Sequence, residues 1–418
     1  MKRILFLICT SIVILNCQPG LAKSGLFFSV SSGAANELII NTTIPNHTYP
    51  TAGIKLNTPG FTLTGAGTEC TMYNGFCLFS VSDTTAKTIS VSGNGKFNAT
   101  LCLNGAGPLS CQKYNNLSVS QIAKYVYITS YANNPPVSVC VVSPTNGQIL
   151  TCQSAGGGSV IAGVTLEGIV INNAGTTAFL TGYTDTPYVY QCAINSSDGT
   201  FMSCSATQIT SPSGYDPEYG MLALNPSNTI AYLVDAASRI LACPIVDNVI
   251  SGVCSDTGAT NVNDGYASQL ALNKAGTTAY LANYSGSPSA FVDVCSVSGT
   301  VFSSCIKKNG GSSITFTETG GVALNNAETI LYVTDYSAGK VYGCSTSPNN
   351  TDLFSSCFVA ASGLSQAWGI ALNSTNTTAY ITNFGNNTYI CPILGDGTFG
   401  TCTTDSSFSE VVGVTLGY

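Results

Sequence analysis

The sequence predicts an all-β fold: a six-bladed β-propeller preceded by a small β-sandwich. The main evidence is a sequence motif that recurs about every 50 residues, as in an array of similar units. Each copy gives two short apolar strands joined by a polar turn, and two more strands with one cysteine each follow. Four strands per repeat with Gly-rich turns is typical of a propeller blade. The five copies begin at Gly168, Gly220, Ser268, Gly320 and Trp368.

The two ends of the array predict how the ring closes. The chain finishes with Val411 to Tyr418, an opening strand with no second strand behind it. Upstream, Lys124 to Tyr131 is a second strand with no opening strand before it. We therefore predict that the C-terminal strand joins the first blade and completes six blades, which also hides open strand edges. The alternative is an open stack of repeats, although no capping repeat is visible.

The composition favours strands and turns over long helices. Charged residues make up 8% of the chain, while the sequence holds 43 glycines; a usual soluble domain is about one quarter charged. The formal net charge is −7 and the 13 basic residues are scattered. Nucleic acid and anionic membranes are therefore poor partners. The 418 residues suffice for a propeller and one smaller domain.

Residues 1–22 are predicted to be an export signal. Lys2 and Arg3 precede an apolar stretch from Ile4 to Leu15, and small residues stand before a cut at Lys23. No later stretch predicts a membrane span. We expect the mature protein in the periplasm or outside the cell. Lipidation at Cys17 is the alternative, but Asn16 stands where a small residue is expected.

The segment 23–118 differs from the repeats, which occupy 119–418. It alternates apolar and polar residues in short runs broken by Pro and Gly, which predicts an antiparallel sandwich of about seven strands. An alternative assigns Phe97 to Cys111 to a degenerate seventh blade.

Cysteine usage predicts disulfides in an oxidising compartment. Without Cys9 and Cys17, sixteen cysteines form eight neighbouring couples, six of them one per blade. Metal ligation competes poorly, because CxxC pairs are absent and the only histidine, His47, lies outside the array. The couples are Cys70/Cys77, Cys102/Cys111, Cys140/Cys152, Cys192/Cys204, Cys243/Cys254, Cys295/Cys305, Cys344/Cys357 and Cys391/Cys402.

The second strands carry a family resemblance over residues 120–418. YITSY at Tyr127, YLANY at Tyr280, YVTDY at Tyr332 and YITNF at Tyr380 resemble the YVTN-type β-propeller repeat, a relative of the NHL repeat. FLTGY at Phe179 and YLVDA at Tyr232 depart from it. The resemblance implies the fold. It implies little about function, because such propellers are binding scaffolds in surface proteins and frames of lactonase-like enzymes.

No catalytic residue is assigned from the sequence. A Ser-His-Asp or Cys-His site needs a histidine, and the repeats contain none. His47 stands in a Pro/Thr-rich stretch that predicts an exposed loop. The 20 acidic residues could still supply a catalytic pair of carboxylates, so a lactonase-like or carbohydrate-acting hydrolase is the alternative function. A purely structural surface protein is a further alternative.

A ligand-binding mouth is predicted from the geometry of a four-stranded meander. The start of strand one and the end of strand two are innermost and lie at the same end of each blade. Amide, carboxylate and aromatic groups there suit a glycan, a peptide or calcium, although such residues also commonly bond their own turns or pack between blades. The strand-two ends are Ser130, Gly182, Asp235, Asn283, Asp335 and Asn383, then Tyr131, Tyr183, Tyr284, Tyr336 and Phe384; the strand-one starts add Glu167, Gln269 and Trp368.

We therefore expect a non-catalytic scaffold, monomeric, that binds a glycan, peptide or protein ligand. No cofactor is expected, with calcium as the open exception, and the sequence leaves the question of a metal site undecided.

Overall fold

The computed structural model describes most of the chain. In the first part it describes residues 27–32, 37–43, 51–57, 62–64, 71–73, 76–80, 87–92, 95–103 and 111–119. In the second part it describes 124–131, 135–143, 146–183, 186–210, 221–234, 239–259, 266–284, 290–311, 314–346, 354, 356–385 and 387–417. The predicted signal at 1–22, His47, Cys70 and Asp235 lie outside these residues.

The chain forms two compact units, Met1–Ile122 and Ala123–Tyr418. In the first unit, the described strands form two antiparallel sheets of orders β1-β2-β7-β4 and β5-β6-β3-β8-β9. In the second of these sheets β8 pairs with β3 as well as with β9, so the two strands that begin at Gly95 and Cys111 lie in a sheet of the first unit. The bounds are β1 Phe27–Ser32, β2 Glu37–Thr43, β3 Thr51–Leu56, β4 Thr62–Thr64, β5 Thr71–Tyr73, β6 Phe76–Ser80, β7 Lys87–Ser92, β8 Gly95–Leu103 and β9 Cys111–Val119.

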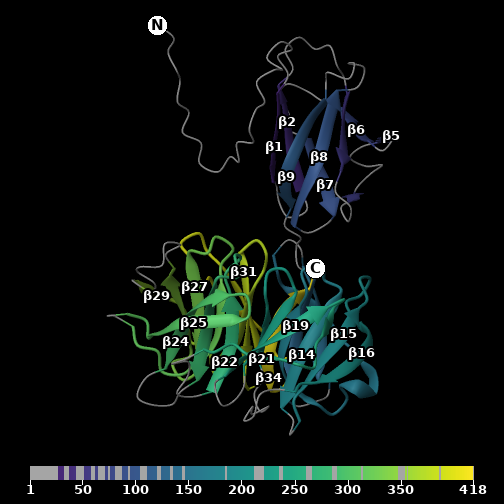
Figure 1. The fold of residues 1–418 in the computed structure, drawn as a ribbon. Helices are drawn as coiled ribbons and strands as arrows, with labels where there is room; N and C mark the ends of the chain where they lie inside the picture. The colour runs from purple at the N-terminus through teal and green to yellow at the C-terminus, as the bar shows by residue number, and fades with distance from the viewer. Residues whose placement is uncertain are drawn as a thin grey trace. The chain divides into compact units, whose positions relative to one another are not determined.

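The second unit has the sheet pattern of a β-propeller: its described strands form antiparallel sheets that follow one another along the chain (Figure 1). The first sheet holds β10 Tyr125–Ser130, β11 Val137–Val142, β12 Ile149–Ser154 and β34 Val411–Gly417. The second holds β13 Thr165–Ile171, β14 Thr177–Tyr183, β15 Tyr188–Ile194 and β16 Phe201–Gln208, and the third β17 Met221–Leu224, β18 Ile230–Val234, β19 Ile240–Val246, β20 Val249–Ile250 and β21 Ser255–Asp256.

The remaining sheets repeat this order. The fourth holds β22 Tyr266–Leu272, β23 Thr278–Tyr284, β24 Phe291–Ser298 and β25 Val301–Lys308. The fifth holds β26 Thr319–Leu324, β27 Ile330–Asp335, β28 Lys340–Ser345 and β29 Cys357–Ser362, and the sixth β30 Ala367–Leu372, β31 Thr378–Asn383, β32 Asn387–Pro392 and β33 Thr403–Asp405. The described helical structure is one 3-10 turn, η2 Gly158–Val160, and no helix among the described residues is long and apolar enough to cross a membrane.

The C-terminal strand completes the first sheet. β34 pairs antiparallel with β10, from Tyr125 opposite Gly417 to Ser130 opposite Val411, and Figure 1 shows this yellow strand within the second unit. β34 contacts both β30 of the sixth sheet and β13 of the second. The opening strands β13, β17, β22, β26 and β30 likewise each contact the next in turn. The predicted pairing of the last strand with the first repeat is present in the structure.

One asparagine makes the turn between strands one and two in five sheets. The Asn325 side-chain oxygen accepts from the backbone N–H of Thr329 and Ile330, and its amide nitrogen donates to the Thr329 hydroxyl. These bonds replace backbone partners that the turn lacks, and they explain why Asn and Thr recur four residues apart. Asn172, Asn225, Asn273 and Asn373 bind their own turns in the same way.

A buried tyrosine of strand two ties each of four sheets to the next. Tyr380 is fully buried, and its hydroxyl donates to the Gly147 carbonyl of the first sheet at 2.6 Å. This bond joins the last repeat to the first. The equivalent bonds are Tyr127 to Gly199, Tyr232 to Gly299 and Tyr332 to Gly397. Phe179, which lacks a hydroxyl, holds the same position in the second sheet.

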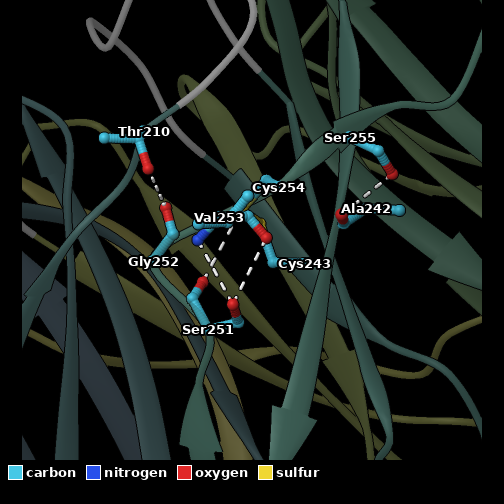
Figure 2. The surroundings of a disulfide bond; sticks show 8 residues. All are labelled: Thr210, Ala242, Cys243, Ser251, Gly252, Val253, Cys254 and Ser255. Atoms are coloured by element: carbon cyan, nitrogen blue, oxygen red, sulfur yellow. Dashed lines mark hydrogen bonds between the residues drawn. A yellow bond between two sulfur atoms is a disulfide. The ribbon is translucent and has the colours of Figure 1, made fainter.

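Disulfides cross-link strands three and four of each sheet. Their Cα separations, 4.0 to 4.4 Å, are those of residues directly opposite in antiparallel strands. In the third sheet, where the fourth strand is broken, Cys254 stands just before β21 and still reaches Cys243 of β19 (Figure 2). There the Gly252 carbonyl accepts from the Thr210 hydroxyl at 2.7 Å.

Seven of the eight predicted pairs are confirmed. They are Cys102–Cys111, Cys140–Cys152, Cys192–Cys204, Cys243–Cys254, Cys295–Cys305, Cys344–Cys357 and Cys391–Cys402. Cys77 is also disulfide-bonded, and its predicted partner Cys70 lies outside the described residues.

Candidate functional site

Five aromatic side chains, four at the ends of second strands and one at the start of a first strand, lie in contact, and we call them the aromatic rim. They come from four sheets: Tyr131 from the first, Tyr284 from the fourth, Tyr336 from the fifth, and Trp368 and Phe384 from the sixth. Phe384 is 37% exposed and the other four are half-buried. The ring centroids are 5.5 Å apart for Tyr131–Phe384, 5.5 Å for Phe384–Trp368, 5.1 Å for Trp368–Tyr284, 5.8 Å for Trp368–Tyr336, 5.9 Å for Tyr284–Tyr336 and 6.4 Å for Tyr336–Phe384.

A polar residue lies beside each of three rim residues. The backbone N–H of Tyr131 donates to the Glu410 carbonyl at 2.9 Å, that of Tyr336 to Glu318 at 2.7 Å and that of Phe384 to Gln366 at 3.2 Å. We call Glu318, Gln366 and Glu410 the polar border. The Gln366 amide also donates to the Tyr336 hydroxyl at 2.7 Å. The Ser337 hydroxyl donates to the Glu318 carboxylate, and Glu410 is exposed.

A β-bulge at the start of strand one positions Trp368. The register of β30 on β31 shifts between Ala367 and Ile370, and the freed Gly369 N–H donates to the Thr382 hydroxyl at 2.8 Å. Thr382 in turn donates to the Val412 carbonyl of β34 at 2.6 Å. A Cβ on Gly369 would lie 2.6 Å from that carbonyl oxygen, so only glycine allows this close approach.

A threonine of strand two makes the same two hydrogen bonds in the first, fifth and sixth sheets, and each links its sheet to the next. Thr334 accepts from Gly321 N–H and donates to the Trp368 carbonyl. Thr129 accepts from Gly413 N–H at 2.8 Å and donates to the Glu167 carbonyl at 2.8 Å. The backbones of Trp368 and Glu167 are therefore fixed by hydrogen bonds from the preceding sheet.

Glu167 is a buried carboxyl group beside the rim. It is 2% exposed, and the Tyr131 hydroxyl donates to its Oε1. Burial raises the pKa of Glu167 from 4.5 to about 8, because a low-dielectric surrounding disfavours the charged form. At neutral pH this group is mostly protonated and contributes little charge to the rim.

The acidic and amide residues at the strand-two ends are buried beneath the rim. Asp335 is fully buried and accepts from the N–H groups of Thr317, Glu318 and Ala338 and from the Thr317 hydroxyl. Asn383 is 3% exposed and accepts from Gly385 N–H at 2.7 Å. Both side chains hold their own loops, so we leave them out of the ligand set proposed below.

Two buried polar groups near the rim lack a partner among the described residues. The side-chain amide of Asn283, which precedes Tyr284, is fully buried, and neither its nitrogen nor its oxygen is hydrogen-bonded. The indole N–H of Trp368 is likewise buried and unpaired. Unpaired buried polar groups cost about 1–3 kcal/mol each, so both are candidate positions for an ordered water.

The Gln269 side chain bonds to backbone groups of neighbouring strands and is not part of the aromatic rim. Its amide oxygen accepts from Val322 N–H at 3.2 Å and Ile370 N–H at 3.3 Å, and its amide nitrogen donates to the Ile370 carbonyl at 3.2 Å. It thus joins the opening strands of the fourth, fifth and sixth sheets. The sequence alignment explains the difference: Gln269 stands where the other repeats have Gly321 and Gly369, and Ser268 is the counterpart of Trp368.

The other predicted site residues are placed as follows. Ser130 is 8% exposed and its hydroxyl donates to the Ser409 carbonyl at 2.5 Å. Tyr183 is 39% exposed and ends β14, after Gly182. Asp235 lies outside the described residues. Within the described parts of the chain, no group of three or more His, Cys, Asp or Glu side chains is placed to hold a metal ion.

Sequence reasoning missed the polar border. Its members share a position three residues before the bulge glycine: Glu318 before Gly321, Gln366 before Gly369 and Glu410 before Gly413. That constant spacing was the available signal.

Comparisons with known proteins return fold-level likenesses. No protein-family model matches the chain, and no curated protein matches it. Similar solved structures include a periplasmic gluconolactonase of Pseudomonas aeruginosa (10% identity, TM-score 0.44, covering 88% of this chain and 99% of that one). Others are a putative 6-phosphogluconolactonase of Bacteroides fragilis (13%, 0.44, 89% and 99%) and the β-propeller domain of Myceliophteria thermophila Cps50 (9%, 0.42, 69% and 86%). Identities and scores this low carry no argument about activity or partners.

Proposed function

We propose that the chain is an exported, six-bladed β-propeller of the YVTN type with an N-terminal β-sandwich, and that it acts as a non-catalytic recognition protein. The closure is supported by the β34–β10 pairing and by the Tyr380 bond from the sixth sheet to the first. Export to the periplasm or cell exterior is supported by the disulfides, which persist in oxidising compartments.

The aromatic rim is the single observation that carries the binding function. Five rings from four sheets form a connected, partly exposed surface. Aromatic residues offer large rigid contact areas and dominate binding energy at interfaces. A ligand of glycan, peptide or protein class would lie on this surface.

The test is a glycan and peptide binding array with the purified mature chain. Trp368→Ala and Phe384→Ala should each remove at least about 90% of the signal of any ligand that binds, since a hot-spot truncation costs about 2 kcal/mol or more. Met202→Ala is the control, because Met202 is 66% exposed and lies on β16 of the second sheet, which contributes no ring to the rim. Binding that survives both rim variants would refute the proposed surface, and no binding at all would favour a purely structural protein.

A carbohydrate-acting or lactonase-like hydrolase is the second candidate. The observation that favours it is Glu167, because a carboxyl group protonated at neutral pH is suited to act as a general acid. Hydrolysis of aryl glycosides or sugar lactones that Glu167→Gln abolishes would establish this alternative.

A further inference from the structure

The aromatic rim and its polar border have the chemistry of a site for positively charged side chains. We propose that the rim binds a cationic peptide segment of a partner protein, with lysine or arginine side chains lying on the rings between Glu318 and Glu410. This proposal rests on the proposed function, which it deepens by naming the ligand class.

The first argument is that Glu318 and Glu410 lie beside the rim. Glu318 and Glu410 precede equivalent bulges in the fifth and first sheets, and the carbonyl of each accepts from the N–H of a rim tyrosine. The two acids therefore border the rim from different sheets. The Glu318 carboxylate is close enough to Tyr284 to contribute, after burial, to the raised pKa of that phenol.

The second argument is that the rings are not occupied by the protein's own cations. Among the residues the structure describes, the cation–π contacts are Lys55 on Phe76 and Lys307 on Phe291, and both involve rings outside the rim. An aromatic face attracts a cation because its π-system carries a negative quadrupole, and Trp provides the strongest such face. Nearby carboxylates add to this attraction.

The third argument is the net charge of −7. An acidic protein attracts cationic partners over long range and repels anionic ones. A neutral glycan would stack on the same rings without needing the two carboxylates. The paired acids therefore favour the cationic peptide over the glycan.

The single tryptophan gives a direct readout, since Trp368 is the only one in the chain. The experiment titrates the full mature protein with a Gly/Ser peptide carrying three arginines and follows tryptophan fluorescence. Its matched probe is the same peptide with citrulline, the neutral analogue, in place of arginine. We expect saturable binding of the arginine peptide at least tenfold tighter than that of the citrulline peptide, and a loss of affinity between 50 and 500 mM salt.

Variants separate this proposal from the proposed function. Glu318→Gln with Glu410→Gln should weaken the arginine peptide about tenfold. Asp247→Asn with Asp256→Asn, which removes the same two charges from exposed positions of the third sheet, should not. Equal binding of both peptides, or no effect of the double variant, overturns the cationic specificity while leaving the rim as a binding surface. If neither these peptides nor any array ligand binds the rim, both proposals fail. Far-UV circular dichroism of each variant confirms that it is folded.

Discussion

Tyr380→Phe tests the bond that joins the two ends of the repeat array. The substitution keeps the ring and removes only the hydroxyl, which donates to the buried Gly147 carbonyl at 2.6 Å. Removing one partner of a buried pair leaves the other unsatisfied and costs about 1–3 kcal/mol. We therefore expect the second unit to lose about 2 kcal/mol of unfolding free energy. At about 2–4 °C per kcal/mol for a large domain, the melting temperature should fall by roughly 4–8 °C.

The assay is guanidinium and thermal unfolding followed by the fluorescence of Trp368, which lies in the second unit and reports on it alone. The slope of free energy against denaturant should not change, because the unfolded surface is the same. Tyr125→Phe is the matched control: Tyr125 is 7% exposed on β10, and its hydroxyl has no partner among the described residues. If Tyr380→Phe is as stable as the wild type, or no less stable than the control, then the Tyr380 bond does not hold the ring closed.

Three further predictions concern two buried polar residues and the disulfides. Glu167→Gln should raise the melting temperature at pH 9 and change it little at pH 4. The pKa of Glu167 in the folded protein, about 8, exceeds the ordinary 4.5, so the wild type loses stability, on the order of several kcal/mol, as pH rises between these values. Equal melting temperatures of both proteins at pH 9 would contradict this. Gln269→Ala should cost about 1–3 kcal/mol by leaving two N–H groups unpaired, measured by denaturant unfolding beside an exposed control on β12, Gln153→Ala; no loss would show that water replaces the amide. Non-reducing peptide mapping should recover Cys70–Cys77 with the other seven pairs, and a free thiol at Cys70 would count against it.

The repeat and its closing strand were predictable because their signals are local. The recurring Asn and Thr mark one turn whose hydrogen bonds lie within six residues, as at Asn325. Cysteines on neighbouring strands face each other at any turn length, so their pairing could be deduced from order alone. The unpaired apolar strand at the C-terminus needed a partner, and Tyr125 to Ser130 was the strand without one.

The roles of the polar residues were less predictable because they depend on a β-bulge. A bulge inserts one residue and reverses the alternation of faces beyond it, so the role of a side chain there depends on its exact place. Gln269 aligns with the bulge glycines Gly321 and Gly369 and not, as predicted, with Trp368. The hydrogen-bond partners of the acidic residues at the ends of the second strands also depend on tertiary contacts. Asp335 accepts from residues 17 and 18 positions earlier, and no local pattern indicates that bond.

Within each repeat, the residues that recur from sheet to sheet hold the structure, and the residue after them differs in its contacts. In the first, fifth and sixth sheets the tyrosine and threonine of strand two bind the next sheet. Asp335 and Asn383, which follow them, bind their own loops, so these positions are committed to structure. The backbone N–H of the next residue is hydrogen-bonded in Tyr131, Tyr336 and Phe384. Their side chains differ in their contacts: the Tyr131 hydroxyl donates to Glu167, the Tyr336 hydroxyl accepts from Gln366, and the Phe384 ring is 37% exposed. The third repeat has Ala236 at this position and Val234 in place of the threonine. The aromatic rim is accordingly contributed by the first, fourth, fifth and sixth sheets, and a ligand bound there would lie off the centre of the ring of sheets.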